Sequence, residues 1–161
     1  MSPRAAAPIE IGSQIDEGAG CGLLLLRLAR AAGYGFGRAL EQLGIRSHHF
    51  AVLHQLDAAG PSSQQAIGQA LRVHPSNLVR LLDELEAEGL VVRGQDPGDR
   101  RRYLLRLTPA GTRLLERARG AVEAAEQDLL APLSPSERRE LHGMLARMSW
   151  HACQGKGRAG C

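Results

Sequence analysis

The segment from Leu78 to Leu107 constrains the fold of this chain more than any other part of the sequence. Four leucines recur at the spacing i, i+3, i+4 and i+7, the period of an amphipathic helix: Leu78, Leu81, Leu82 and Leu85. Two short apolar runs follow at 90–92 and 103–107, and they flank a turn-forming stretch with three consecutive arginines. Apolar runs around such a turn predict a β-hairpin. A helix that ends at Gly89 and leads into a basic hairpin is the layout of a winged helix-turn-helix.

Positive charge is concentrated in this predicted hairpin. The chain has 20 Lys and Arg against 17 Asp and Glu, a formal net charge of +3. Residues 91–107 hold five arginines and two aspartates, which gives 5 − 2 = +3, so the rest of the chain balances. A local basic patch on a neutral body is the electrostatic footprint of a protein that binds nucleic acid. A solvated charged turn is the alternative, and the helix in front of the hairpin argues against it.

Apolar periodicity and capping residues predict further helices on both sides of this segment. They are expected at 19–43, 47–59, 64–71, 109–130 and 134–151, with the leucine-striped helix at 75–88. Ser47 is expected to cap the second helix, and Ser62 with Gln65 to form a capping box at the third. Thr108 and Ser134 are expected to cap the last two helices, each followed by a proline at the first helical position.

Length and composition favour a single, mainly helical domain. The chain has 161 residues, and an aromatic content of 3% leaves Leu, Ala and Val to fill the core. We expect a flexible arm at 1–18, one domain at 19–153 and a flexible tail at 154–161. The longest apolar run, 22–26, is too short to span a bilayer, and the N-terminus does not resemble a signal peptide. A cytoplasmic protein that does not associate with membranes is therefore expected.

Three motifs resemble the MarR family of bacterial transcriptional regulators. They are Leu85–Arg93, Asp99–Arg101 and Leu107–Gly111, and the predicted helices around them fall where that family has them. The resemblance implies a mainly α fold with a small β-hairpin wing, with the winged helix-turn-helix at about 47–107. It also implies a homodimer joined through N- and C-terminal helices, here about 19–44 and 108–151. A two-fold symmetric dimer binds a pseudo-palindromic operator in double-stranded DNA, and a repressor is expected.

The helix at 75–88 is the predicted recognition helix. Its leucines face the core, so Ser76, Asn77 and Arg80 lie on the other side near its N-terminus, the part that helix-turn-helix proteins place over base edges. Asn can pair with adenine and Arg with guanine, each through two hydrogen bonds. His74 and the start of the preceding helix, with Gln64 and Gln65, are expected to meet phosphates, because helix N-termini carry partial positive charge.

In the hairpin, one arginine is expected to enter the minor groove. The resemblance assigns an Asp-x-Arg element to Asp99 and Arg101, in which the aspartate holds an arginine that supports the wing. Which of Arg100, Arg101 and Arg102 inserts into the groove stays open.

The resemblance also implies a ligand crevice between the dimer helices and the DNA-binding part, which often takes small aromatic acids. Arg27 or Arg30 could bind the carboxylate, with His48 or His49 beside it; ordinary surface or interface salt bridges are the alternative. Release by such a ligand is the expected regulation. The competing hypothesis is peroxide sensing through Cys21, although Arg46–His49 stands where the peroxide-sensing branch has tyrosines. An inert thiol is the simpler interpretation.

Other classes of function find little support. His48, His49 and His54 raise the hypothesis of a metal-responsive repressor, but no pair has matching metal-ligand spacing, and no metal or cofactor is expected. No Gly-rich phosphate loop or catalytic Ser/His/Asp order is present, so an enzyme is not expected. A winged-helix module that contacts only proteins would not need three arginines at the wing tip.

Overall fold

The structure is a computed structural model that describes residues 20–155 except residue 97, with the backbone alone for residues 100–102 and 153–155. These residues form six helices and two strands. The elements are α1 (Cys21–Glu41), α2 (Ser47–Ala59), α3 (Gln64–Leu71), α4 (Pro75–Ala87), β1 (Val91–Asp96), β2 (Asp99–Leu107), α5 (Pro109–Leu129) and α6 (Pro135–Gly155). The last helix ends four residues later than predicted. The predicted arm at 1–18 and most of the predicted tail lie outside the described residues.

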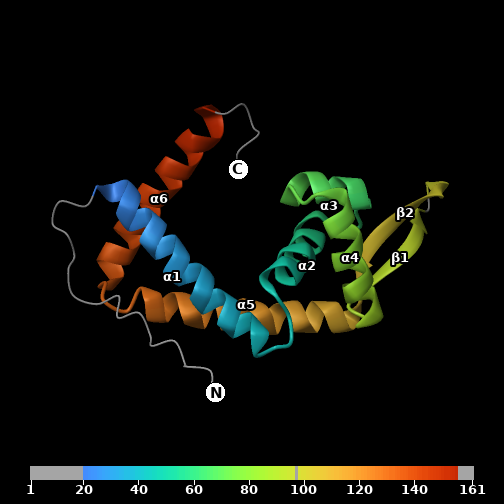
Figure 1. The fold of residues 1–161 in the computed structure, drawn as a ribbon, viewed down its shortest axis with the longest axis horizontal. Helices are drawn as coiled ribbons and strands as arrows, with labels where there is room; N and C mark the ends of the chain where they lie inside the picture. The colour runs from blue at the N-terminus through green and yellow to red at the C-terminus, as the bar shows by residue number, and fades with distance from the viewer. Residues whose placement is uncertain (1–19, 97, 156–161) are drawn as a thin grey trace, which may run out of the picture.

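The elements are arranged along the long helix α5, which connects two parts of the molecule (Figure 1). Helices α1 and α6 lie at one end, and α1 packs against α5. Helices α2, α3 and α4 lie at the other end, and the antiparallel hairpin β1–β2 projects beyond them. The mainly α fold with a two-stranded wing agrees with the prediction.

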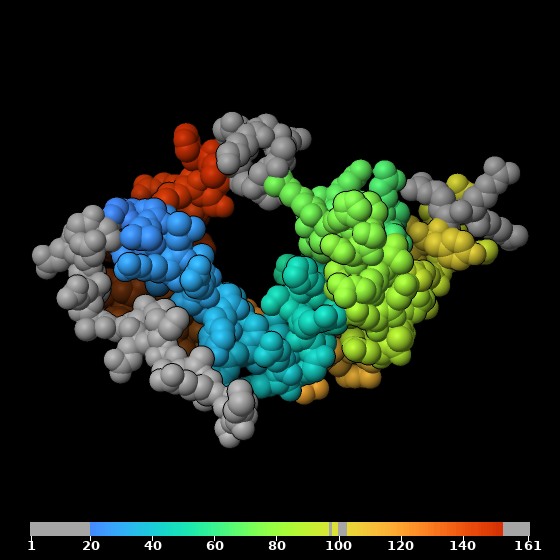
Figure 2. Space-filling model, in the orientation of Figure 1, coloured from blue at the N-terminus to red at the C-terminus, as the bar shows by residue number. Residues whose placement is uncertain are grey.

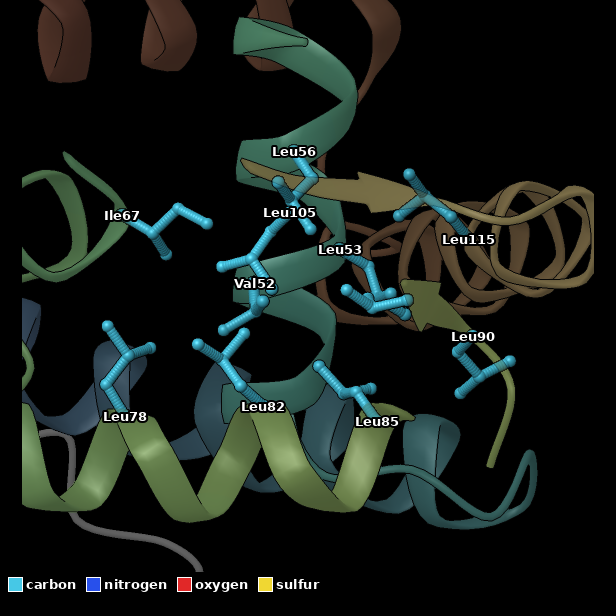
Figure 3. Close-up of a cluster of buried hydrophobic side chains, with 11 residues drawn as sticks. Val52, Leu53, Leu56, Ile67, Leu78, Leu82, Leu85, Leu90, Leu105 and Leu115 are labelled. Atoms are coloured by element: carbon cyan, nitrogen blue, oxygen red, sulfur yellow. The ribbon is translucent and has the colours of Figure 1, made fainter. Parts of the chain in front are cut away.

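We call α2, α3, α4 and the hairpin β1–β2 the winged part. One apolar cluster holds it together (Figure 3). The four leucines of the predicted stripe are all buried on one face of α4. Leu78, Leu82 and Leu85 point towards α2, as Figure 3 shows. The cluster also contains Val52, Leu53 and Leu56 from α2, Ile67 from α3, Leu105 from the wing and Leu115 from α5. Because these side chains converge from five elements, the polar face of α4 is turned away from the core.

Two capping predictions are wrong by one residue. Ser63, not Ser62, caps α3, and its Oγ accepts a hydrogen bond from the Ala66 N–H at 3.2 Å. Ser62 is extended and pairs with β2: its N–H donates to the Leu105 carbonyl at 3.1 Å, and the Leu105 N–H donates back at 2.8 Å. The wing therefore gains a short bridge on its second edge. Similarly, α2 is capped from Arg46, because the His49 side chain accepts the Arg46 N–H and Ser47 is already helical.

The end of α4, the base of the wing and the start of α5 meet at one place. The contacts there explain residues of two motifs, Leu85–Arg93 and Leu107–Gly111. Gly89 ends α4 with a left-handed φ of 68°, which glycine adopts without strain. The Thr108 Oγ1 donates to the Gly89 carbonyl at 2.7 Å and accepts from the Gly111 N–H at 3.0 Å. This confirms Thr108 as the cap of α5. A Cβ at Gly111 would lie 2.1 Å from the Leu90 carbonyl oxygen, so glycine allows α5 to begin against the wing.

Candidate nucleic-acid interface

The N-terminal half of α4 presents a row of exposed polar side chains. Ser76, Asn77 and Arg80 are all exposed, as the leucine spacing predicted. His74 is also exposed at the N-cap position, and its Nδ1 lies 2.9 Å from the Ser76 Oγ. Pro75 at the first helical position costs no hydrogen bond, because an amide there has no intrahelical partner. The polar side chains at this end of the helix are therefore accessible from outside the molecule.

Helix α3 lies beside this surface. Gln65 is exposed and Gln64 is half-buried. Both line a groove of about 620 Å³ between α3 and α4, to which Pro75 also contributes. The structure thus brings the predicted residues of α3 next to the start of α4. Gln69 lines the same groove and is exposed, and the sequence interpretation missed it.

The three arginines of the wing lie at the tip of β2. Gln95 and Asp96 are consecutive in β1, but their partners are Tyr103 and Asp99, so the register shifts around residues 100–102. A bulge of this kind bends the tip and separates it from the regular ladder. Asp99 and Tyr103 are exposed on either side of the arginines. The predicted contact between Asp99 and Arg101 stays a prediction, since the Arg101 side chain lies outside the description, as does Pro97 of the predicted turn.

Ionic contacts at the C-terminal half of α4 fix this helix against the wing. Arg93 on β1 contacts two carboxylates of α4, Asp83 at 2.7 Å and Glu86 at 2.9 Å. Its N–H also donates to the Glu86 Oε1 at 3.4 Å. Arg93 therefore adds ionic contacts between the hairpin and α4 to the apolar packing that holds them together. The sequence interpretation missed this contact, although Arg93 lies within one of the quoted motifs.

A second contact fixes α4 against α2. Glu84 accepts a hydrogen bond from the His49 Nε2 at 2.9 Å and another from the Arg46 guanidinium. The hydrogen bond from His49 lowers the pKa of Glu84, with a further contribution from the positive charge of Arg46. His49 was predicted beside a ligand, but its side chain is buried against α4. Its neighbour His48 is exposed.

A crevice of about 710 Å³ separates the winged part from the terminal helices. It is lined by Phe50 and His54 of α2, by Arg119, Val122, Glu123, Glu126 and Gln127 of α5, by Leu130, and by Arg138, Arg139 and His142 of α6. Figure 2 shows a hollow between the two parts of the molecule. The position of the crevice agrees with the prediction, but the basic residues differ. Arg27 and Arg30 lie elsewhere, exposed along α1.

Two of the arginines in the crevice are already paired. Arg119 contacts Asp57 at 2.7 Å, and Arg138 donates to the Leu133 carbonyl at 3.0 Å and to the Gln127 side chain. Arg139 and His142 are exposed at the α6 wall, and His54 is exposed at the α2 wall. The sequence interpretation missed these side chains because they come from three helices and share no motif.

Cys21 is the first residue of α1, where its thiol is exposed and free. Within the ranges that the structure describes, no three potential metal ligands (His, Cys, Asp or Glu) come together. The same ranges contain no helix that is both long and apolar enough to cross a membrane.

The terminal helices expose many apolar side chains in the single copy. They are Leu23, Leu24, Leu26 and Leu28 on α1, and Met144, Leu145, Met148 and Trp150 on α6. Among residues 135–152 of α6, no side chain is fully buried. Four apolar residues of α6 recur at the spacing i, i+3, i+4 and i+7, and most of them face away from the rest of this copy: Leu141, Met144, Leu145 and Met148.

Comparisons of the sequence point to one family. A model of the MarR family matches residues 43–102, from the start of the winged part to the wing tip. A putative transcriptional regulatory protein for the hcr operon of Thauera aromatica is 44% identical over 86 residues, or 53% of this chain and 52% of that protein, so the match spans about half its length. The uncharacterized HTH-type transcriptional regulator YkoM of Bacillus subtilis is 31% identical over 115 residues, or 71% of this chain and 75% of that protein.

Solved structures show the same fold. A crystal structure of MarR matches with a TM-score of 0.76 and 26% identity, over 90% of this chain and 99% of that one. The Mycobacterium tuberculosis MarR family protein Rv2887, in complex with DNA, matches with a TM-score of 0.72 and 28% identity over 81% and 98% of the chains. CouR of Rhodococcus jostii RHA1, bound to p-coumaroyl-CoA, matches with a TM-score of 0.65 and 30% identity over 79% and 90%.

Proposed function

The chain belongs to the MarR family of DNA-binding transcriptional regulators, as its motifs predicted, and from this premise we propose that it is a cytoplasmic homodimer that represses transcription from a pseudo-palindromic operator. The family consists of regulators and not of enzymes, in agreement with the sequence prediction. One observation carries the proposal: the exposed polar start of α4 and the arginine-bearing wing tip both lie in the part of the molecule opposite α1 and α6 (Figure 1).

The two elements have different roles in this proposal. Asn77 and Arg80 contact base edges in the major groove, where each base pair presents a distinct pattern of donors and acceptors. The wing arginines enter the minor groove, whose negative potential is strongest where it is narrow. His74 and the start of α3, with Gln64 and Gln65, contact phosphates and set the register of the protein on the duplex.

The terminal helices provide the surface for a second copy. Their exposed apolar side chains lie on α1 and α6, at the end of the molecule opposite the wing. A concentration of large exposed apolar side chains on two helices is typical of an interaction site. In a two-fold symmetric dimer the two recognition helices face successive half-sites of one duplex, which is why a pseudo-palindrome is expected.

Selection of duplexes from a random pool tests this function. The protein should enrich a pseudo-palindrome and bind it as two copies per duplex. Within the enriched site, Arg80→Ala should relax preference at one position in each half-site, at a cost of about 1–3 kcal/mol. An exposed arginine of α5, such as Arg113→Ala, is the control. Failure to enrich any sequence would favour a module that contacts only proteins.

For the regulation we propose a small organic anion that binds in the crevice and lowers DNA affinity. The crevice supports this, because it combines the apolar Phe50 and Val122 with the exposed side chains of Arg139 and His142. CouR, which shares the fold, is bound to p-coumaroyl-CoA. A ligand acts on DNA binding only if it prefers the arrangement that does not bind DNA. Thiol sensing by Cys21 and a metal response are the rival mechanisms.

A screen of aromatic carboxylates against the protein–DNA complex separates these mechanisms. Release by a carboxylate should be lost in Arg139→Gln and kept in Arg27→Ala, Arg30→Ala and Cys21→Ser. If release were lost in Arg27→Ala or Arg30→Ala instead, the ligand would bind at the arginines of α1 that the sequence predicted. Release by peroxide that disappears in Cys21→Ser would identify a thiol sensor.

A further inference from the structure

The N-terminus of α2 carries a buried histidine whose two ring nitrogens contact different parts of the molecule. His49 is 4% exposed, and its Nε2 lies 2.9 Å from the Glu84 Oε2. An ionised carboxylate only accepts hydrogen bonds, so this contact requires a proton on Nε2. The Arg46 Nη2 lies 3.2 Å from the same Nε2, and it donates to the Glu84 carboxylate. The Nδ1 then accepts the backbone N–H of Arg46 at 3.5 Å, which a proton on Nδ1 would oppose. The ring therefore caps α2 through one nitrogen and contacts α4 through the other.

Glu84 lies on the recognition helix between the two carboxylates that face the wing. Asp83 and Glu86 pair with Arg93 of β1, while Glu84 pairs with His49 and Arg46 of α2. The helix is thus held by polar contacts on two sides at its C-terminal half. Its N-terminal half, where Asn77 and Arg80 lie, has exposed polar side chains. A small rotation about the fixed half would displace the other half relative to a groove.

We infer that His49 is a positioning residue for operator binding: its Nε2–H bond to Glu84 sets the angle of α4 at which Asn77 and Arg80 meet base edges. This inference rests on the proposed function of DNA binding. Burial of the leucine stripe fixes which face of α4 is turned towards α2, but hydrophobic attraction has no direction, so the stripe tolerates small rotations of the helix. The hydrogen bond from His49 has a fixed geometry and lies off the leucine stripe, so it can set the angle of α4 within the small range that the stripe tolerates.

A role in positioning differs measurably from a role in stability. A residue that only stabilises the fold would change the binding of operator and scrambled duplex in parallel, through the folded fraction. A residue that sets the angle of α4 would change the binding of operator alone, since scrambled duplex is held mainly through phosphates.

Two substitutions separate the two nitrogens of the ring. In His49→Gln the amide nitrogen takes the place of Nε2 and still donates to Glu84. In His49→Asn the amide oxygen takes the place of Nδ1 and still accepts from Arg46, but the side chain does not reach Glu84. Both variants bury a neutral amide of similar size, so their free energies of unfolding should fall by similar amounts. They differ in whether the contact with α4 remains.

The affinities of wild type and both variants are measured for the selected operator and for its scrambled duplex, beside urea unfolding. We expect His49→Asn to lose about tenfold or more in the ratio of the two affinities, as for a hydrogen bond to a charged group. His49→Gln should keep most of that ratio, and scrambled binding should not change. Glu84→Gln keeps a hydrogen-bond acceptor for His49, so it should also keep most of the ratio of operator to scrambled affinity. Glu84→Leu has no acceptor and should lose this ratio, as His49→Asn does.

Equal ratios in His49→Asn, His49→Gln and wild type would overturn the inference and leave His49 with a role in stability alone. A parallel loss on both duplexes that follows the free energy of unfolding would also overturn it. Lack of operator preference in the wild type itself would reject the proposed function, and with it this inference; the failure of the two is thereby distinguished.

Discussion

At the scale of single residues, Gly111 shows how a side chain can be excluded by a neighbouring backbone. We predict that Gly111→Ala lowers the free energy of unfolding by about 1–3 kcal/mol, as overpacking does. The reason is that the new Cβ would lie 2.1 Å from the Leu90 carbonyl oxygen, and a carbonyl cannot turn away as a flexible side chain can.

Gly120→Ala on the same helix is the control, because nothing lies within 4 Å of a Cβ at that position. Removing a glycine from a helix interior should raise stability by about 1 kcal/mol. Urea unfolding of both variants measures the two effects. If Gly111→Ala were as stable as Gly120→Ala, the close approach of α5 to the wing would be wrong.

At the scale of elements, the contact between α2 and α4 predicts a dependence on pH. The pKa of Glu84 lies below the ordinary value of 4.5, chiefly because His49 donates a hydrogen bond to the carboxylate. A lowered pKa in the folded state means that ionised Glu84 stabilises the fold. This contribution is fully present above the ordinary pKa and is lost as the pH falls through the lowered one.

Glu84→Gln should therefore be less stable than wild type at neutral pH, and the difference should shrink as the pH is lowered below 4.5. Urea unfolding across this range measures it, with Glu116→Gln, an exposed carboxylate of α5, as the control. A difference that stays constant down to the acid end would mean that ionised Glu84 does not hold α4.

Features that depend on residues close together in the chain could be predicted from the sequence. The leucine stripe of α4, the cap at Thr108 and the hairpin all depend on residues close together in the chain, and the structure has them where expected. Ser62 was assigned as a cap because Gln65 follows at the right spacing. Its actual partner is Leu105, in a strand that no local pattern connects to it.

The candidate site divides in the same way. Ser76, Asn77 and Arg80 could be predicted, because a buried stripe leaves a definite opposite face. His49 was placed beside a ligand on the strength of residue type, but its environment depends on Glu84, 35 positions away. The crevice could be expected from the resemblance, whereas its lining from α2, α5 and α6 depends on the packing of three helices.

At the scale of the whole molecule, the chain combines an apolar end with a basic one. The exposed leucines and methionines of α1 and α6 lie opposite the wing, so a dimer formed through them leaves both wings open. The net charge of +3 equals the charge of residues 91–107 alone. The body therefore contributes little long-range attraction to DNA, and binding should depend on the wing more than on overall charge.

The most direct test of this account is the salt dependence of operator binding when Arg100, Arg101 and Arg102 are all replaced by Ala. Each phosphate contact that is lost reduces the slope of log affinity against log salt by about one. We predict a large loss of affinity and a shallower slope, with stability changed by less than about 0.5 kcal/mol because the wing tip is a surface feature. Arg113→Ala with Arg117→Ala, on the exposed face of α5, should leave both nearly unchanged. Wild-type affinity and slope in the triple variant would contradict the assignment of the wing to DNA.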